Sequence, residues 1–193
     1  MIDVRPFQPE DKPQILVIYR RAFSDPFGVW REKDLPMTKV LERWHCYQEK
    51  NGFQCLAAVM AAENRVVGTI WWDMPTLKEL GAERGWQLEA FARQHIGNNQ
   101  ALVWERGVIT DPAYKNRKVA TGLRKAMLAK ISQNGSTLVL TRMRADNPAI
   151  LAIATKLGFQ PTGIKTPSHK WPDVVHQYWY KLVPGCISLM QAE

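Results

Sequence analysis

Cysteine is scarce in this chain, and the few cysteines show no framework spacing. The 193 residues include three of them, Cys46, Cys55 and Cys186, whereas a small disulfide-stabilised domain uses an even number at regular spacings. Neither Cys46 nor Cys55 stands at a zinc-site spacing from His45. The sequence therefore argues against a disulfide framework and against a metal site, and it favours a reduced, cytoplasmic compartment.

Long apolar runs are also absent. The longest nearly uninterrupted run is Cys55 to Ala62, whereas a membrane-spanning helix needs about 20 apolar residues. The first residues, Met-Ile-Asp-Val-Arg, lack the apolar core of a signal peptide. We therefore expect no membrane partner.

Several functional motifs are missing as well. The chain has no Gly-x-Ser-x-Gly elbow and no Walker loop, which argues against the α/β-hydrolases and the P-loop nucleoside triphosphatases that carry them. It has no zinc finger and no RNA-recognition signature, so nucleic acid is not the expected partner. It also has no internal repeat and no low-complexity tract.

The composition is that of an ordinary globular protein. Hydrophobic residues make up 46% and charged residues 23% of the chain, so disorder is not expected. The length suits one α/β domain, which we place at residues 1–183, followed by a tail at 184–193. Lys and Arg number 26 against 18 Asp and Glu, a formal net charge of +8. That excess suits a polyanionic ligand, and equally nucleic acid or an acidic surface.

The most informative stretch runs from Val108 to Phe159. The apolar, partly β-branched run Leu102 to Ile109 predicts a buried strand, and Asp111-Pro112 ends it. A helix is then predicted from near Lys118, because apolar residues recur at helical spacing. Its buried face consists of Val119, Leu123, Met127 and Ile131.

The turn before this helix is a candidate anion site. The first N–H groups of a helix lack partners within it and carry partial positive charge, which favours a phosphate. Ala120, Thr121 and Gly122 are small enough for a ligand to approach the backbone. Full positive charges surround the same point, from Lys115, Arg117, Lys118, Arg124 and Lys125. On physical grounds alone, a solvated basic helix start explains this pattern equally well.

These residues resemble the pyrophosphate loop of the GNAT acetyltransferases, which usually reads Pro-x-Tyr-Arg-Gly-x-Gly-[Ile/Leu/Val]-[Gly/Ala]. The stretch Asp111 to Ala120 follows that pattern. The later stretch Asn147 to Phe159 resembles the second motif of the family, an Asn followed by a short helix that ends in Leu-Gly-Phe. The resemblance implies an α/β fold with a mixed, splayed β-sheet flanked by helices. It also implies acetyl-CoA as co-substrate and no metal.

The resemblance further implies which residues bind acetyl-CoA. The turn from Thr110 to Gly122 would hold the pyrophosphate, and Asn147 would contact the pantetheine arm. The expected cofactor-binding residues are Val108, Ile109, Thr110, Lys115, Asn116, Arg117, Lys118, Val119, Ala120, Thr121, Gly122 and Asn147.

The chain departs from the family pattern at several positions. Asn116 and Lys118 replace the two loop glycines, and although Lys118 adds charge, Lys rarely adopts the left-handed backbone that Asn tolerates. Ala154 stands where many members carry a Tyr that protonates the leaving thiolate, although some branches place Asn there. Arg142 stands where some members carry a Glu that acts as the general base.

The candidate general base is Glu105, on the strand that leads into the turn. A Glu paired with a neighbouring Arg on a sheet face is the competing interpretation. His176 and Tyr178 on the last predicted strand are lesser candidates. His95 and His169, in an insertion and a loop, are expected at the surface.

The rest of the chain predicts elements compatible with this fold. An edge strand is predicted at Ile2 to Phe7, and two helices at Ile15 to Ala22 and Met37 to Tyr47. Gln54 to Ala61 and Val66 to Trp72 read as a hairpin. At least one of Trp71 and Trp72 belongs to the core, since neighbours on a strand face opposite sides; the other could line the cleft, although ordinary core use is the better interpretation.

A helical insertion is predicted around residues 76–97. Thr76-x-x-Glu79 is a capping-box pattern, and Gly81 and Gly85 favour two short helices over one. We expect the insertion to cover one side of the acceptor cleft, with a packing role as the alternative. Residues 162–172 are predicted as a loop and 174–182 as a half-buried strand.

The sequence therefore predicts a GNAT-type N-acetyltransferase that acts on a primary amine of a small molecule or peptide. Two alternatives stay open. One is a catalytically weak acyl-CoA sensor of the same fold, because both frequent catalytic positions are replaced. The other is a basic nucleic-acid-binding protein that uses exposed Trp and Arg. A homodimer is compatible with the sequence, which does not identify the acceptor.

Overall fold

The computed structural model describes residues 1–23, 37–97, 100–168 and 173–185. The chain forms two compact units. Unit 1 consists of Met1–Asp73 and Gly107–Met127, and unit 2 of Met74–Arg106 and Leu128–Glu193. His169 and Cys186 lie outside the described residues.

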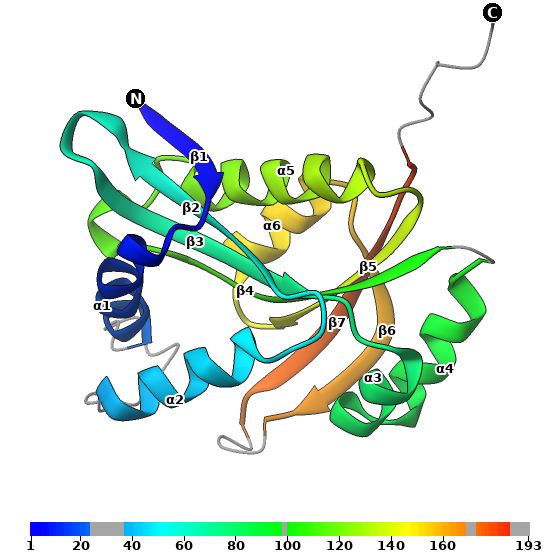
Figure 1. Ribbon diagram of the computed structural model, residues 1–193. Coiled ribbons are helices and arrows are strands. Elements are labelled where there is room, and N and C mark those ends of the chain that lie inside the picture. Colours follow the sequence, from blue (N-terminus) through cyan, green and yellow to red (C-terminus); the bar gives the residue numbers. More distant parts are fainter. Residues whose placement is uncertain (24–36, 98–99, 169–172, 186–193) are drawn as a thin grey trace, which may run out of the picture. The chain divides into compact units, whose positions relative to one another are not determined.

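Unit 1 contains an antiparallel sheet, two whole helices and the first part of a third (Figure 1). Strand β1 (Ile2–Pro6) pairs with β2 (Gln54–Met60), and β2 pairs with β3 (Arg65–Asp73). The β2–β3 connection is a short 3-10 turn, η2 (Ala61–Glu63), followed by Asn64 at φ 45°. The expected edge strand and hairpin are thus confirmed.

Helices α1 (Lys12–Phe23) and α2 (Met37–Gln48) build the core of unit 1. Ile15, Ile18 and Tyr19 are all buried at helical spacing on α1. They pack with Trp44 of α2 and Trp71 of β3, whose rings lie 6.0 Å apart. Trp71 and Trp72 are 2% and 1% exposed, so both are core residues and neither lines a cleft.

Unit 2 contains a mixed sheet. Strand β4 (Ala101–Thr110) pairs in parallel with β5 (Thr137–Arg144), which pairs antiparallel with β7 (Val175–Val183). Strand β6 (Gln160–Pro167) completes this part by antiparallel pairing with β7. The strand order is β1-β2-β3-β4-β5-β7-β6, which confirms the expected mixed α/β sheet.

Two elements contribute residues to both units. Strand β4 belongs to unit 2 up to Arg106 and to unit 1 from Gly107. Helix α5 (Val119–Ser132) belongs to unit 1 up to Met127 and to unit 2 beyond it. The expected buried face of α5 is confirmed, since Val119, Leu123, Met127 and Ile131 are at most 5% exposed.

The insertion forms two helices, α3 (Leu77–Arg84) and α4 (Trp86–His95), as expected (Figure 1). The capping box is formed, because the Thr76 hydroxyl accepts from the Glu79 amide and the Glu79 carboxylate accepts from the Thr76 amide. Gly85 separates the helices at φ 96°, a conformation that favours glycine. Leu80, Leu88 and Ala92 bury the insertion against the unit 2 sheet.

The predicted loop at 162–172 is wrong over its first half, where β6 extends to Pro167. Pro161, Gly163 and Pro167 argue for a loop in the sequence. Strand β6, however, is the last strand in the sheet order, and an edge strand tolerates residues that cannot donate to a second neighbour. Residues 169–172 are outside the described part of the chain.

Candidate active site

The parallel ladder between β4 and β5 runs from Ala101–Thr137 to Glu105–Thr141. Strand β4 continues to Thr110 and β5 to Arg144. Glu105 is therefore the last paired residue of β4 in that ladder, and it is 3% exposed. Because side chains alternate along a strand, Glu105 faces away from Trp104, which packs with the insertion.

The turn after β4 is anchored in unit 1 by Asp111. Its amide donates to the Val67 carbonyl of β3 at 2.8 Å. Its buried carboxylate accepts from the Ala113 amide at 3.0 Å and from Arg65 Nη2 at 3.2 Å, and Arg21 Nη1 lies 3.7 Å away. These contacts fix the start of the turn against the neighbouring strand.

The buried ring of Tyr114 packs inside the turn. It ends the 3-10 segment η3 (Pro112–Tyr114) and is 8% exposed. The guanidinium carbon atoms of Arg65 and Arg117 lie 5.4 and 5.2 Å from its ring centre, within cation–π range. The aromatic residue of the motif therefore positions Arg117 at the turn.

Asn116 and Lys118 have the left-handed backbone that glycine supplies in the family pattern. Their φ values are 62° and 60°. The expectation that Lys would not adopt this conformation is wrong at Lys118. The neighbouring residues fix it there, because the anchored η3 segment precedes it and α5 begins at the next residue.

The start of α5 packs closely on β3 within unit 1. A Cβ on Gly68 would lie 2.7 Å from Val119 Cγ1 and 2.9 Å from the Ile109 carbonyl oxygen. Only a residue without a side chain fits at this contact. The close packing fixes where the unpaired N–H groups of the first helical turn point.

The expected cofactor-binding residues of unit 1 divide into exposed and packed ones. Lys115, Asn116, Arg117 and Lys118 are exposed, whereas Ile109 and Val119 are buried. Arg124 is 1% exposed, so its charge is not displayed at the surface of the turn as expected. Val108, Thr110, Ala120, Thr121 and Gly122 are partly exposed.

The second motif lies in unit 2 and forms a capped helix, α6 (Pro148–Lys156). Asn147 is its N-cap, since Oδ1 accepts from the Ile150 amide at 3.2 Å. The helix ends at Lys156, Gly158 follows with φ 77°, and the Phe159 amide donates to the Ala154 carbonyl at 3.0 Å. The Leu-Gly-Phe ending is thus a helix stop. Ala154 is fully buried.

Unit 2 also gathers a group of basic residues that sequence reasoning missed. Arg84 ends α3, Arg106 follows Glu105 on β4, and Arg142 and Arg144 end β5. Burial, together with Arg142 and Arg144, lowers the pKa of the adjacent His176 to about 4. Alternation with the apolar residues of β4 and β5 is the only signal that places Arg106, Arg142 and Arg144 on one face.

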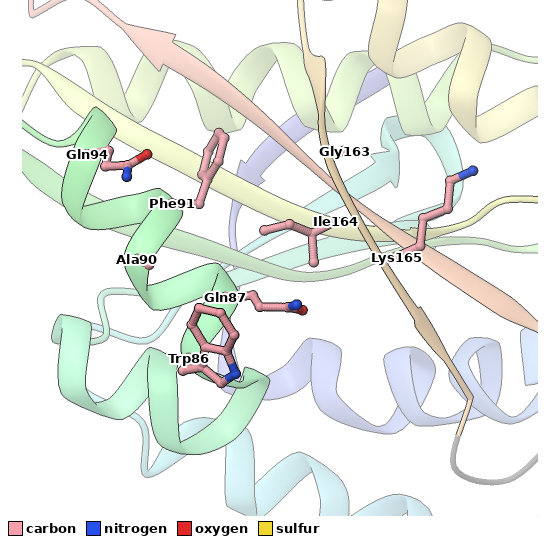
Figure 2. A pocket seen from close by; sticks show the side chains of 8 residues that line it. All are labelled: Trp86, Gln87, Ala90, Phe91, Gln94, Gly163, Ile164 and Lys165. Carbon is pink, nitrogen blue, oxygen red and sulfur yellow. The ribbon is translucent and has the colours of Figure 1, made fainter.

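A groove lies between α4 and the edge strand β6 in unit 2 (Figure 2). Its volume is about 580 Å³. Trp86, which is 74% exposed, and Phe91 supply its aromatic surface. His95, expected at the surface, is only partly exposed and stacks on Phe91 with ring centres 3.9 Å apart.

Neither a metal cluster nor a spanning helix is found in the described part of the chain. No group of three or more His, Cys, Asp and Glu side chains is arranged to hold a metal ion there. No helix among the same residues is long and apolar enough to cross a bilayer.

Comparison with known families decides the assignment. The model of the Acetyltransferase (GNAT) domain matches residues 2–160. The chain belongs to the GNAT acetyltransferase family. This acetyltransferase thus carries both motifs, the basic turn and the capped second helix, within the matched range. No curated protein sequence matches it at a significant level.

Solved structures share the fold of this acetyltransferase at low sequence identity. A phosphinothricin acetyltransferase from Sinorhizobium meliloti in complex with AcCoA is 16% identical with a TM-score of 0.66, over 96% of this chain and 90% of that chain. A ribosomal-protein-alanine N-acetyltransferase from Brucella melitensis is 17% identical with a TM-score of 0.65, over 93% and 99%. YncA from Salmonella typhimurium, solved with acetyl-CoA, is 15% identical with a TM-score of 0.65, over 94% of each chain.

Proposed function

We propose that this acetyltransferase transfers acetyl from acetyl-CoA to a primary amine of a small molecule or peptide. The observation that carries the proposal is the left-handed pair Asn116 and Lys118 directly before α5. Such a backbone turns successive N–H groups toward one point, where a phosphate is favoured. Lys115, Arg117 and Lys118 add exposed positive charge there.

The remaining expected contacts belong to the same proposal. Val108, Ile109 and Thr110 would line the thioester from β4, and the first turn of α5 would hold the diphosphate. Asn147 would meet the pantetheine arm through its side-chain amide, since its Oδ1 is used to cap α6. We propose that residues 1–183 act as one domain, because β4 and α5 contribute to both units.

The chemistry needs a neutral amine, because an alkylammonium with a pKa of about 10.4 has no lone pair to attack with. The amine nitrogen bonds to the thioester carbon, the carbon–sulfur bond breaks, and the amine proton passes to a base. We assign Glu105 as that base, directly or through a water. The thiolate, with a thiol-like pKa of about 8.5, leaves as an anion or takes a proton from water. Ala154 supplies no acid, so a slower enzyme is expected.

Cofactor binding is tested by calorimetry with acetyl-CoA. Replacement of Arg117 and Lys118 by Ala should weaken binding by about tenfold or more, because each removes a charge-assisted contact. Lys78→Ala, an exposed lysine on α3, is the matched control and should leave the affinity unchanged. Absence of binding at millimolar acetyl-CoA would reject the proposal.

The base is tested by a thiol-release assay over a panel of amines. Glu105→Gln should lower turnover by about 10² to 10⁴ and retain acetyl-CoA binding. The exposed Glu63→Gln in η2 serves as the control. Unchanged turnover in Glu105→Gln would refute the assignment.

A catalytically weak sensor is the second candidate. The fully buried Ala154 and the presence of Arg142 at the frequent base position favour it. Tight acetyl-CoA binding without thiol release for any amine would select it over the enzyme. A steep salt-dependent affinity for random DNA would instead favour nucleic-acid binding.

We also propose a cytoplasmic location on the evidence of the cysteines. Cys46 and Cys55 are both free thiols. Burial raises the pKa of the Cys55 thiol to about 12, so that residue is an inert core group. Thiol labelling of the protein in intact cells tests whether the exposed Cys46 remains reduced.

A further inference from the structure

The basic cluster of unit 2 consists of Arg84, Arg106, Arg142, Arg144 and His176. The sheet register places Arg144 of β5 opposite His176 of β7, and Arg142 opposite Tyr178. The guanidinium of Arg84 lies over the Trp104 ring, 5.0 Å from its centre. The cluster therefore combines the end of α3 with the ends of two parallel strands and with β7.

Positive charge exceeds negative charge in this cluster. Arg106 Nη1 lies 2.6 Å from Glu83 Oε2, and Arg84 Nε is 3.9 Å from the same oxygen. Arg144 pairs with Asp146, and Asp173 also acts on it. The Arg142 guanidinium is exposed and makes no hydrogen bond or ion pair with any residue that the structure describes.

Two buried nitrogen atoms of the cluster lack hydrogen bonds to the described residues. They are Arg84 Nε and His176 Nδ1, and His176 as a whole is 8% exposed. A buried polar atom without a partner lowers the stability of the fold, and native proteins rarely contain one. Burial, then Arg142, lowers the pKa of Arg84, as expected where like charges crowd together.

The cluster lies at the carboxyl ends of the parallel strands β4 and β5. Arg106 and Arg142 each follow the last pair of the β4–β5 ladder, Glu105–Thr141. Ligands of open α/β sheets bind beyond the carboxyl ends of parallel strands. Glu105 and Arg106, as neighbours, face opposite sides of β4. An acidic group held by the arginines would lie at the same strand end as the proposed base, on the opposite face of the sheet.

We propose that the amine acceptor of this enzyme carries an oxyanion, a carboxylate or a phosphoryl group, which Arg84 and Arg142 bind. The proposal rests on the amine acetylation argued above and names its substrate class. Arg106 positions Glu83, which in turn lies beside Arg84. Guanidinium groups suit both oxyanions, because their N–H donors match two oxygen atoms at once.

The first experiment measures thiol release from acetyl-CoA with matched amines. One series pairs amino acids with their amides, and the other pairs aminoalkyl phosphonates with alkylamines of the same length. The acidic member of each pair should have a kcat/KM higher on the order of ten- to a hundredfold, the effect of one or two hydrogen bonds to a charged group. Equal or better use of the neutral members would overturn the proposal.

The exposed Arg142 is the variant of choice, since its removal leaves the packed residues in place. Arg142→Gln should raise the KM of the acidic amine tenfold or more and leave acetyl-CoA affinity unchanged, whereas Arg142→Lys should retain part of the preference. Arg93→Gln, an exposed arginine of α4 paired with Glu89, is the control. An unchanged KM in Arg142→Gln would also overturn the proposal.

A second measurement separates this inference from the proposed function. The His176 imidazole is followed by NMR while inorganic phosphate is added to the full-length protein. A bound anion should offset the arginines and raise the pKa of His176, and Arg142→Gln should reduce the response. If no amine is acetylated but the imidazole responds, the enzyme proposal fails and the anion site stands. If the imidazole does not respond to phosphate in the millimolar range, the anion site is wrong.

Discussion

The proposed cofactor turn has an unfavourable backbone conformation at Lys118. Left-handed conformation costs an L-residue other than glycine about 1–2 kcal/mol, and Lys118 adopts it at φ 60°. Its side chain therefore stays at this position at the expense of stability. A cationic group beside a diphosphate is a physical reason to keep it, whereas glycine would supply the same backbone without charge.

Lys118→Gly should stabilise the fold and weaken the cofactor site. Glycine removes the cost of about 1–2 kcal/mol that the left-handed conformation imposes on Lys. It adds a cost of about 0.5–1 kcal/mol, because glycine has more conformational freedom in the unfolded chain. The free energy of unfolding should therefore rise by about 0.5–1 kcal/mol. Urea denaturation measures this change, and calorimetry should show weaker acetyl-CoA binding. Lys115→Gly is the control, because Lys115 has φ −55° and glycine there should destabilise. If both variants destabilise alike, the turn is not strained at Lys118.

The imidazole of His176 should make the protein sensitive to acid. Burial and the nearby Arg142 and Arg144 lower its pKa to about 4, below the value of about 6.5 for the unfolded chain. The folded state thus prefers the neutral ring, so this contribution is complete above pH 6.5 and is lost as the pH falls toward 4.

Replacement of His176 by a residue that does not ionise shows how much of the pH dependence of stability comes from its imidazole. His176→Gln, which does not ionise, should show a shallower loss of stability between pH 6.5 and 4 in urea unfolding. Arg84 and Asp146 also face the ring, and both keep their charge through most of that range. Parallel stability curves for the two proteins would contradict the assignment.

The close contact between β3 and the start of α5 holds the helix, and with it the turn, in place on the sheet. Gly68→Ala would place a methyl group 2.9 Å from the backbone oxygen of Ile109, and a backbone atom moves less readily than a side chain. Overpacking of this kind costs about 1–3 kcal/mol. We expect this loss in unfolding free energy, together with weaker acetyl-CoA binding, because the start of α5 would shift.

The same helix offers a matched control. Gly122 has open space around its added Cβ position, and Gly to Ala inside a helix stabilises by up to about 1 kcal/mol. Gly122→Ala should therefore raise the unfolding midpoint while Gly68→Ala lowers it. A neutral Gly68→Ala would show that the close approach is not required.

Local patterns predicted most elements, and their failures have identifiable causes. Helix α5 and the capped insertion follow from periodicity and capping chemistry that act within a few residues. Strand β6 was missed because Pro161 and Gly163 indicate a loop until the edge position of the strand is known. The turn was found through its charges and motif, although side-chain propensity alone argued against the conformation of Lys118.

The basic cluster could not be found from the sequence, because it depends on tertiary structure. Arg84, Arg106 and Arg142 come from three separate elements, and each resembles an ordinary solvated charge in isolation. Only strand register and helix packing bring their charges within reach of His176. Strand order, set by long-range pairing, is beyond local patterns for the same reason.

At the scale of the whole molecule, the division of β4 and α5 between the two units has a thermodynamic consequence. Neither unit keeps a complete β4 or α5 by itself, and a helix or strand cut in the middle loses the cooperative bonds of both parts. We therefore expect a single unfolding transition, in which the calorimetric and van't Hoff enthalpies agree.

Substitutions confined to one unit test this expectation. Ile15→Val in the core of unit 1 should cost about 0.5–1.5 kcal/mol, and Leu88→Ala in that of unit 2 about 2–5 kcal/mol, since both side chains are fully buried. In a single cooperative domain, each variant moves the whole calorimetric peak to lower temperature without splitting it, and tryptophan fluorescence and circular dichroism give the same midpoint. In two independent domains, each variant would move only part of the heat absorption, and the probes would separate. The second pattern would show that residues 1–183 do not fold as one domain.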